Sequence, residues 1–141
     1  GLVGLVTEVG PHYARVRSII DNSSNVSAMI LSTSDTCIVR GDLKLMDDGR
    51  LRFEKLANND NDIKVGEQVV TSYVSDRFVQ GLFIGYISEI NVDSNNLTRS
   101  GYITPAVDFS KIQEVLVLTK TKEDMTNGAD DKSASDTAKG E

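Results

Sequence analysis

Three kinds of side chain in this sequence could carry out chemistry on a substrate: the single histidine His12, the single cysteine Cys37, and the serines Ser72 and Ser75. A serine or cysteine nucleophile needs a histidine base that is itself held by a carboxylate. His12 follows Pro11 at the tip of an expected hairpin, and Cys37 lies in an apolar run. No Gly-x-Ser-x-Gly motif is present. The pattern predicts an exposed turn histidine, a small core cysteine and no enzymatic activity.

The sequence also contains no convincing motif for binding a metal or a cofactor. Asn58, Asp60 and Asp62 have the alternating spacing that opens a calcium loop, but Ile63 stands where that loop needs glycine and Val69 where it needs glutamate. One cysteine excludes an internal disulfide and any multi-cysteine metal site. No glycine-rich phosphate loop precedes a helix. We therefore expect neither a metal nor a cofactor, and interpret 58–62 as an acidic turn.

Composition narrows the class of protein. The 141 residues carry 15 Lys plus Arg against 21 Asp plus Glu, a formal charge of −6, which argues against nucleic acid as a partner. No apolar run reaches the roughly 18–20 residues of a membrane span. Residues 120–141 contain no Val, Ile, Leu, Phe or Tyr, which predicts a disordered polar tail. The chain starts without Met, so we expect it to be a piece of a longer protein.

The elements that must position any site are short strands. Period-2 patterning recurs at about ten-residue spacing and predicts strands at 3–9, 13–20, 26–31, 37–40, 43–46, 51–56, 68–72, 82–90, 100–108 and 114–118. Strands 43–46 and 51–56 flank Asp47-Asp48-Gly49 as in a hairpin. A single helical turn, capped by Asp108 or Ser110, is expected at 109–113. The sequence predicts an all-β fold.

One internal similarity bears on domain organisation. Residues 4–9 match residues 85–90 position for position by residue type. Two halves built on one plan would be two small β-barrels or sheets packed side by side. The match between the two segments is equally well explained by chance, because strands that open with glycine are common.

Hydrophobic side chains crowd the loop 73–81 and its flanks, namely Tyr73, Phe78, Val79, Leu82 and Phe83. Exposed aromatic clusters on loops are typical of protein-binding sites. The alternative is that Phe78 and Phe83 close one end of a barrel from inside. The candidate partner contacts are Tyr73, Phe78, Val79 and Phe83.

Three blocks of residues resemble one known family. The first is Gly1-Leu2-Val3-Gly4-Leu5-Val6-Thr7-Glu8-Val9-Gly10 followed by Ala14-Arg15-Val16-Arg17; the second is Val65-Gly66-Glu67-Gln68-Val69-Val70-Thr71-Ser72 followed by Phe78-Val79-Gln80-Gly81-Leu82-Phe83-Ile84-Gly85; the third is Pro105-Ala106-Val107-Asp108-Phe109 ending in Glu114-Val115-Leu116-Val117-Leu118. Together they resemble the extracytoplasmic domain of the rod shape-determining protein MreC family. The chain departs from that pattern at Tyr73, where the family usually has glycine, and at Phe78-Val79, where it usually has Phe-Pro.

The resemblance implies a fold and a role. It implies two small β-barrels in a trypsin-like arrangement without catalytic residues, within 1–119. It implies a non-enzymatic scaffold of the bacterial cell-elongation machinery, outside the cytoplasmic membrane. The implied partners are a class B penicillin-binding protein, MreD and the MreB filament, and the full-length protein would self-associate. A membrane helix, a coiled coil and the first β-strands would precede this piece.

Two other classes of function remain open at this point. One is a carbohydrate-binding β module on the cell wall, disfavoured because the chain has no Trp and few clustered Tyr. The other is a degenerate trypsin-like hydrolase using His12 or Cys37. Labelling by an active-site-directed reagent would support the second.

Overall fold

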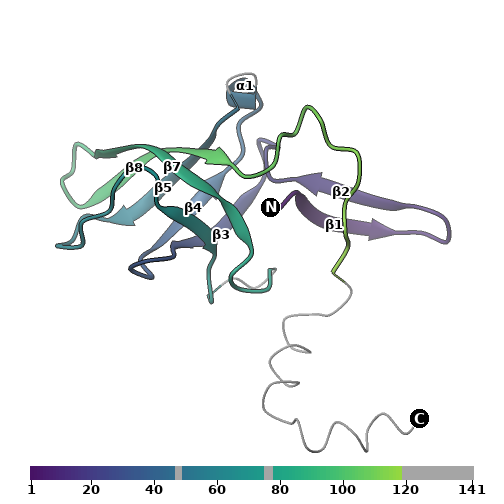
Figure 1. The fold of residues 1–141 in the computed structure, drawn as a ribbon, viewed down its shortest axis with the longest axis horizontal. Helices are drawn as coiled ribbons and strands as arrows, with labels where there is room; N and C mark the ends of the chain where they lie inside the picture. The colour runs from purple at the N-terminus through teal and green to yellow at the C-terminus, as the bar shows by residue number, and fades with distance from the viewer. Residues whose placement is uncertain (47–48, 75–77, 119–141) are drawn as a thin grey trace, which may run out of the picture.

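Six antiparallel strands close into a small barrel. The computed structural model describes residues 1–46, 49–74 and 78–118. The barrel order is β3-β4-β5-β8-β7-β6, with β6 pairing back to β3, from these strands: β3 (Asn25–Ile30), β4 (Thr36–Arg40), β5 (Leu51–Ala57), β6 (Gln68–Thr71), β7 (Phe83–Val92) and β8 (Thr98–Pro105). Two further strands, β1 (Gly4–Val9) and β2 (Ala14–Ser18), form a hairpin beside it (Figure 1). The all-β prediction is confirmed.

Alternation of side chains explains why these segments form a barrel. In β3, Val26, Ala28 and Ile30 are buried, whereas Ser27 and Met29 between them are only partly buried. Every strand of the barrel contributes such inward residues, with Phe53 of β5 completely buried among them. Burying one such side chain stabilises the fold by about 1.5–3 kcal/mol, so the filled interior holds the barrel closed.

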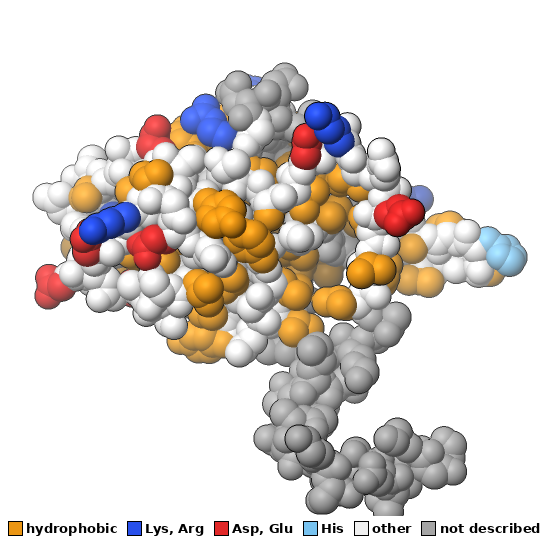
Figure 2. Space-filling view, viewed as in Figure 1, with side chains coloured by type: hydrophobic (Ala, Val, Ile, Leu, Met, Phe, Trp, Pro, Cys, Tyr) orange, Lys and Arg blue, Asp and Glu red, His pale blue; other side chains and the backbone are white. Residues whose placement is uncertain are grey.

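The hairpin projects away from the barrel, as Figure 1 shows, and the histidine at its tip is the pale blue side chain in Figure 2. The Tyr13 hydroxyl donates to Glu8 at 2.8 Å, and the Gly10 amide donates to the Tyr13 carbonyl. The base of the hairpin is hydrogen-bonded to the barrel, because the Leu2 amide donates to the Phe83 carbonyl at 2.8 Å. This hydrogen bond joins the base of the small second sheet to the barrel.

The predicted strand at 43–46 is wrong. These residues form the short helix α1 (Leu43–Met46). Asp42 caps this turn, because its carboxylate accepts the Lys44 amide at 2.9 Å and its carbonyl accepts the Leu45 amide. The predicted hairpin with strand 51–56 therefore does not form, and its central residues 47–48 lie outside the described part of the chain.

The C-terminal segment differs from its prediction too. Residues 106–118 contain no assigned strand, although 114–118 were expected to form one. No helix forms at 109–113, but Asp108 does cap a short turn: its carboxylate accepts the Ser110 amide, and its carbonyl accepts the Lys111 amide. Phe109 packs against the core. The predicted disordered tail, 120–141, lies outside the described residues.

The glycines shared by 4–9 and 85–90 are explained in part by close packing of each strand against its neighbour. A Cβ on Gly4 would lie 2.3 Å from the Arg17 carbonyl oxygen, and one on Gly85 would lie 2.2 Å from the Thr104 carbonyl oxygen. Both strands therefore need glycine where the neighbouring strand approaches closely. Their positions differ, because β1 lies in the hairpin and β7 lies inside the barrel wall between β6 and β8. A division of 1–119 into two barrel-like halves stays a prediction.

Candidate interaction surface

Two aromatic side chains lie together on the outer wall of the barrel. The rings of Phe83 and Tyr86 in β7 meet edge to face, with centroids 5.1 Å apart. A register shift opposite Val69 and Val70 places an extra residue between the paired positions of β7. This bulge allows residues three apart to share the outer side, whereas a regular strand would point them to opposite sides. Tyr86 is 44% exposed. Figure 2 shows hydrophobic side chains gathered in the middle of this face.

The loop 73–82 begins and ends beside this pair. The Thr71 amide donates to the Leu82 carbonyl, and the Thr71 hydroxyl both donates to the Val79 carbonyl and accepts the Leu82 amide. One buried threonine thus holds both ends of the loop. Tyr73, two residues beyond it, is 54% exposed, whereas Val79 is half-buried. Residues 75–77 of the loop are outside the described part.

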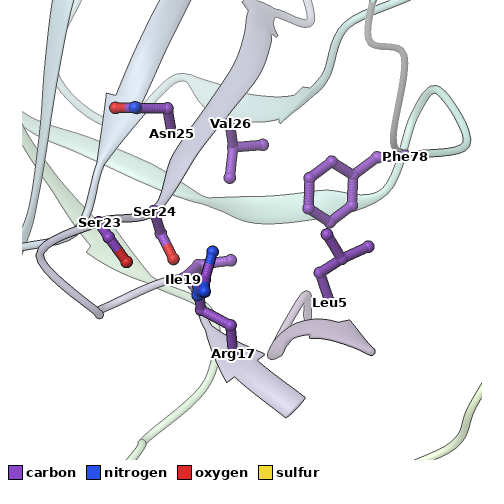
Figure 3. A pocket seen from close by; sticks show the side chains of 8 residues that line it. All are labelled: Leu5, Arg17, Ile19, Ser23, Ser24, Asn25, Val26 and Phe78. Carbon is purple, nitrogen blue, oxygen red and sulfur yellow. The ribbon is translucent and has the colours of Figure 1, made fainter. Parts of the chain in front are cut away.

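Phe78 does not belong to the exposed patch that the sequence predicted. Its side chain is 7% exposed and is a member of the barrel core, as the barrel-closing alternative expected. Figure 3 shows its ring directed toward Leu5 of β1, across the junction between hairpin and barrel. The crevice there, about 20 Å³, has room for a water molecule but not for an organic ligand. Phe78 is therefore a core anchor for the loop.

We define the β7 aromatic surface as Phe83 and Tyr86. Of the predicted contacts it keeps Phe83, whereas exposed Tyr73 and half-buried Val79 lie in the adjoining loop. The role of these residues in partner binding stays a prediction. Tyr86 was missed by the sequence analysis. Strict alternation along 82–90 would place Tyr86 on the same side as buried Ile84, so the local pattern carries no signal that could have found it.

At one end of the barrel, a buried arginine organises the loop that had the calcium-like spacing. Arg99 of β8 is 7% exposed, and its guanidinium donates to the Ala57 carbonyl, the Asn61 carbonyl and the Asn59 side-chain oxygen. The Asn59 and Asn61 amides in turn donate to the Asp35 carboxylate at 3.0 and 2.9 Å. These contacts fix the conformation of residues 57–61 against β8.

The residues considered for catalysis are spread over different parts of the fold. His12 is at the hairpin tip, Cys37 points into the barrel core, and Ser72 is buried with its hydroxyl accepting the Val74 amide. Ser75 lies outside the described residues. Among those described, no nucleophile is placed beside His12. A Ser-His or Cys-His arrangement is therefore not assembled here.

Burial raises the pKa of the Cys37 thiol to about 12. The thiol of the unfolded chain ionises near pH 8.5–9, so above that range the unfolded state loses a proton that the folded state keeps. Stability should consequently fall by up to about 1.4 kcal/mol per pH unit between pH 9 and 12 from this group. Urea unfolding at pH 8 and pH 10 should show a smaller loss in Cys37→Ala than in the parent. Identical losses would contradict this coupling.

Within the part of the chain that is described, no helix has the length and apolar character to cross a bilayer. The fold and its surface define a class: a small antiparallel β-barrel domain with a projecting hairpin and an aromatic patch on its outer wall. A family model described as rod shape-determining protein MreC, barrel core, matches residues 1–119. The chain belongs to this family.

Individual relatives agree. The cell shape-determining protein MreC of Listeria monocytogenes is 32% identical over 147 residues, covering 100% of this chain and 48% of the relative. The chain thus spans about half the length of that relative. A solved structure of MreC from Listeria monocytogenes has a TM-score of 0.69 and 31% identity, covering 79% of this chain and 53% of that chain.

A more distant structure shares the fold. It is a complex between penicillin-binding protein PBP2 and MreC from Helicobacter pylori. The similarity has a TM-score of 0.56 at 18% identity and covers 86% of this chain and 68% of that chain.

Proposed function

We propose that this chain is part of a non-enzymatic scaffold that maintains bacterial cell shape by organising peptidoglycan-synthesis proteins outside the cytoplasmic membrane. Membership of the MreC family supports a role in shape determination. The observation that carries the binding role is the Phe83–Tyr86 pair on the barrel wall, in which Tyr86 is exposed and Phe83 is half-buried. Buried aromatic anchors commonly dominate the energy of protein–protein interfaces. The dispersed positions of His12, Cys37 and Ser72 support a role without catalysis.

The proposed partner is a class B penicillin-binding protein. The support from relatives is the Helicobacter pylori complex, in which an MreC protein is bound to PBP2. MreD contact, self-association and a membrane anchor belong to the same proposal for the full-length protein.

The neighbours of the aromatic pair suit a binding site. Tyr86 lies between Gln68 of β6 and Thr104 of β8 in the barrel register, and both of these polar residues are exposed. Interfaces typically combine an apolar centre with a polar rim that hydrogen-bonds to the partner or to water. The β7 aromatic surface therefore has the composition of an interface centre with its rim.

Binding should be measured by titrating the chain with the extracytoplasmic part of the cognate class B penicillin-binding protein. Tyr86→Ser and Phe83→Ser should each weaken binding at least about tenfold, corresponding to about 1.4 kcal/mol or more. The matched control is Val92→Ser, because Val92 is an exposed apolar residue at the other end of β7. Val92→Ser should bind as the parent does.

Other outcomes would decide against parts of the proposal. Equal binding by all three variants would exclude the β7 aromatic surface as the contact. Absence of binding by the folded parent chain would assign the contact to other parts of the full-length protein. Light scattering on the chain alone would report its own oligomeric state in the same experiment.

A further inference from the structure

The outer wall of the barrel continues past the β7 aromatic surface as a row of side chains on neighbouring strands. β7, β8 and β5 are adjacent in the sheet and lie side by side in Figure 1. Tyr86 is paired with Thr104 of β8, and Tyr102, two residues before Thr104, is paired with Arg52 of β5. Cross-strand partners share a face, as do residues two apart in one strand. The aromatic side chains of β7 and β8 therefore lead to a cationic side chain on β5.

This cationic side chain faces a second arginine. The register places Arg40 of β4 directly opposite Arg52, and like charges in that position destabilise a sheet. One carboxylate offsets part of the repulsion, because Arg40 forms an ion pair with Glu54. Arg52 is exposed and forms no ion pair with any residue in the described part of the chain. The two arginines therefore share one carboxylate, and binding a further anion would remove the remaining repulsion.

The charges around this pair are mainly positive. The guanidinium of Arg50 lies over the ring of Tyr102, 4.4 Å from the ring centroid, which keeps another cation on the same wall. The acidic residue at the β7 end of the row is Glu89, which is paired with Tyr102 and accepts the Asn91 side-chain amide. The whole chain carries a formal charge of −6, so a cluster of arginines is a local exception. A positive patch favours a partner that presents negative charge there.

The aromatic and cationic parts of the wall have a defined separation. Neighbouring strands are about 4.8 Å apart and residues rise about 3.4 Å along a strand, so Tyr86 and Arg52, two strands and two residues apart, are separated by roughly 12 Å. An extended peptide covers that distance in about four residues, and residues four apart in it point to the same side. One short segment can therefore contact both parts.

We propose that Arg52, with Arg40 beside it, binds a carboxylate of the protein partner that the β7 aromatic surface contacts. An extended partner segment then carries an apolar side chain for Phe83 and Tyr86 and an aspartate or glutamate about four residues away. The carboxylate offsets the repulsion between the arginines, so the ionic contact adds specificity to the apolar one. This inference rests on the proposed function and names the chemistry by which the partner is recognised.

Charge reversal tests the ionic contact. In the titration described above, Arg52→Glu should weaken binding at least about tenfold. The matched control is Lys55→Glu, which makes the same change of charge at an exposed lysine further along β5. Charges more than about 8 Å apart are largely screened at 0.15 M salt, so Lys55→Glu should weaken binding less than about twofold. Arg52→Glu should unfold at the same temperature as the parent or higher, because it also removes the repulsion from Arg40.

Variants of the partner identify the carboxylate. When each exposed aspartate or glutamate of the partner is replaced in turn by lysine, one variant should bind Arg52→Glu at least about tenfold more tightly than the unmodified partner does. Failure of every such variant to restore binding would overturn the proposal.

The same titration separates this inference from the proposed function. Parent-like binding by Arg52→Glu, with weakened binding by Tyr86→Ser, would overturn the arginine contact and leave the proposed function in place. Equal weakening by Arg52→Glu and Lys55→Glu would also overturn it, since that result would report overall charge alone. Absence of binding by the folded parent chain would overturn both.

Discussion

Replacing Arg99 with methionine should lower the free energy of unfolding by about 3–5 kcal/mol. Hydrogen bonds from a charged donor contribute about 1.5–3 kcal/mol each, and a buried acceptor left without its partner costs a further penalty. Methionine keeps the apolar stem of Arg99. The Ala57 and Asn61 carbonyls, however, lose the hydrogen bonds that the guanidinium donates to them. The loop 58–62 would lose its attachment to β8. The urea midpoint should fall by about 1.5–2 M, measured by circular dichroism.

The control for this prediction is Arg52→Met. Arg52 also lies in a barrel strand, β5, but is exposed on its outer side, so its replacement should change stability by no more than about 0.5 kcal/mol. Equal effects of the two substitutions would mean that the hydrogen bonds of Arg99 are not what stabilises the loop.

Phe78→Ala should destabilise the chain by about 3–4 kcal/mol, in the range expected when a phenyl ring is removed from a core. The ring closes the barrel interior and faces Leu5 of the hairpin, so its loss should loosen both the loop 73–82 and the hairpin base. Thermal or urea unfolding measures the first effect. Hydrogen exchange at the Leu2 amide, which donates to Phe83, measures the second.

The comparison variant is Phe83→Ala at the neighbouring surface. Phe83 is half-buried, so its truncation should cost about 1 kcal/mol or less while it weakens partner binding. A Phe78→Ala chain as stable as the parent, with binding lost, would return Phe78 to the contact surface. The pair of variants thus separates the core anchor from the proposed interface.

Local patterning determined most of the fold. The period-2 alternation of the barrel strands is a property of consecutive residues, because neighbouring side chains in a strand point to opposite sides. The positions of β3, β4 and β5 could therefore be predicted from their own residues. The family resemblance rested on short blocks of this kind and is confirmed by the match over residues 1–119.

Local patterning misled where a distant group decided the conformation. Residues 43–46 alternate as a strand does, but the Leu43 amide donates to the side chain of Asn22, which stands 21 residues earlier. That contact, together with the Asp42 cap, makes a short helix the better-bonded conformation. Asn22 is too far from 43–46 in the sequence for local patterning to take its contact into account.

The candidate site shows the same division. The sequence alone determined that aromatic residues gather around 73–83, but it could not distinguish Phe78 from Phe83 as buried or exposed. The tertiary structure separated them, because Thr71 holds both ends of the loop and directs Phe78 inward while Phe83 stays on the wall. Tyr86 joined the surface only through the bulge in its pairing with β6. Arg99 is the strongest case: a charged residue is expected in water, yet it is buried here because carbonyl groups some 40 residues away in the sequence accept its hydrogen bonds.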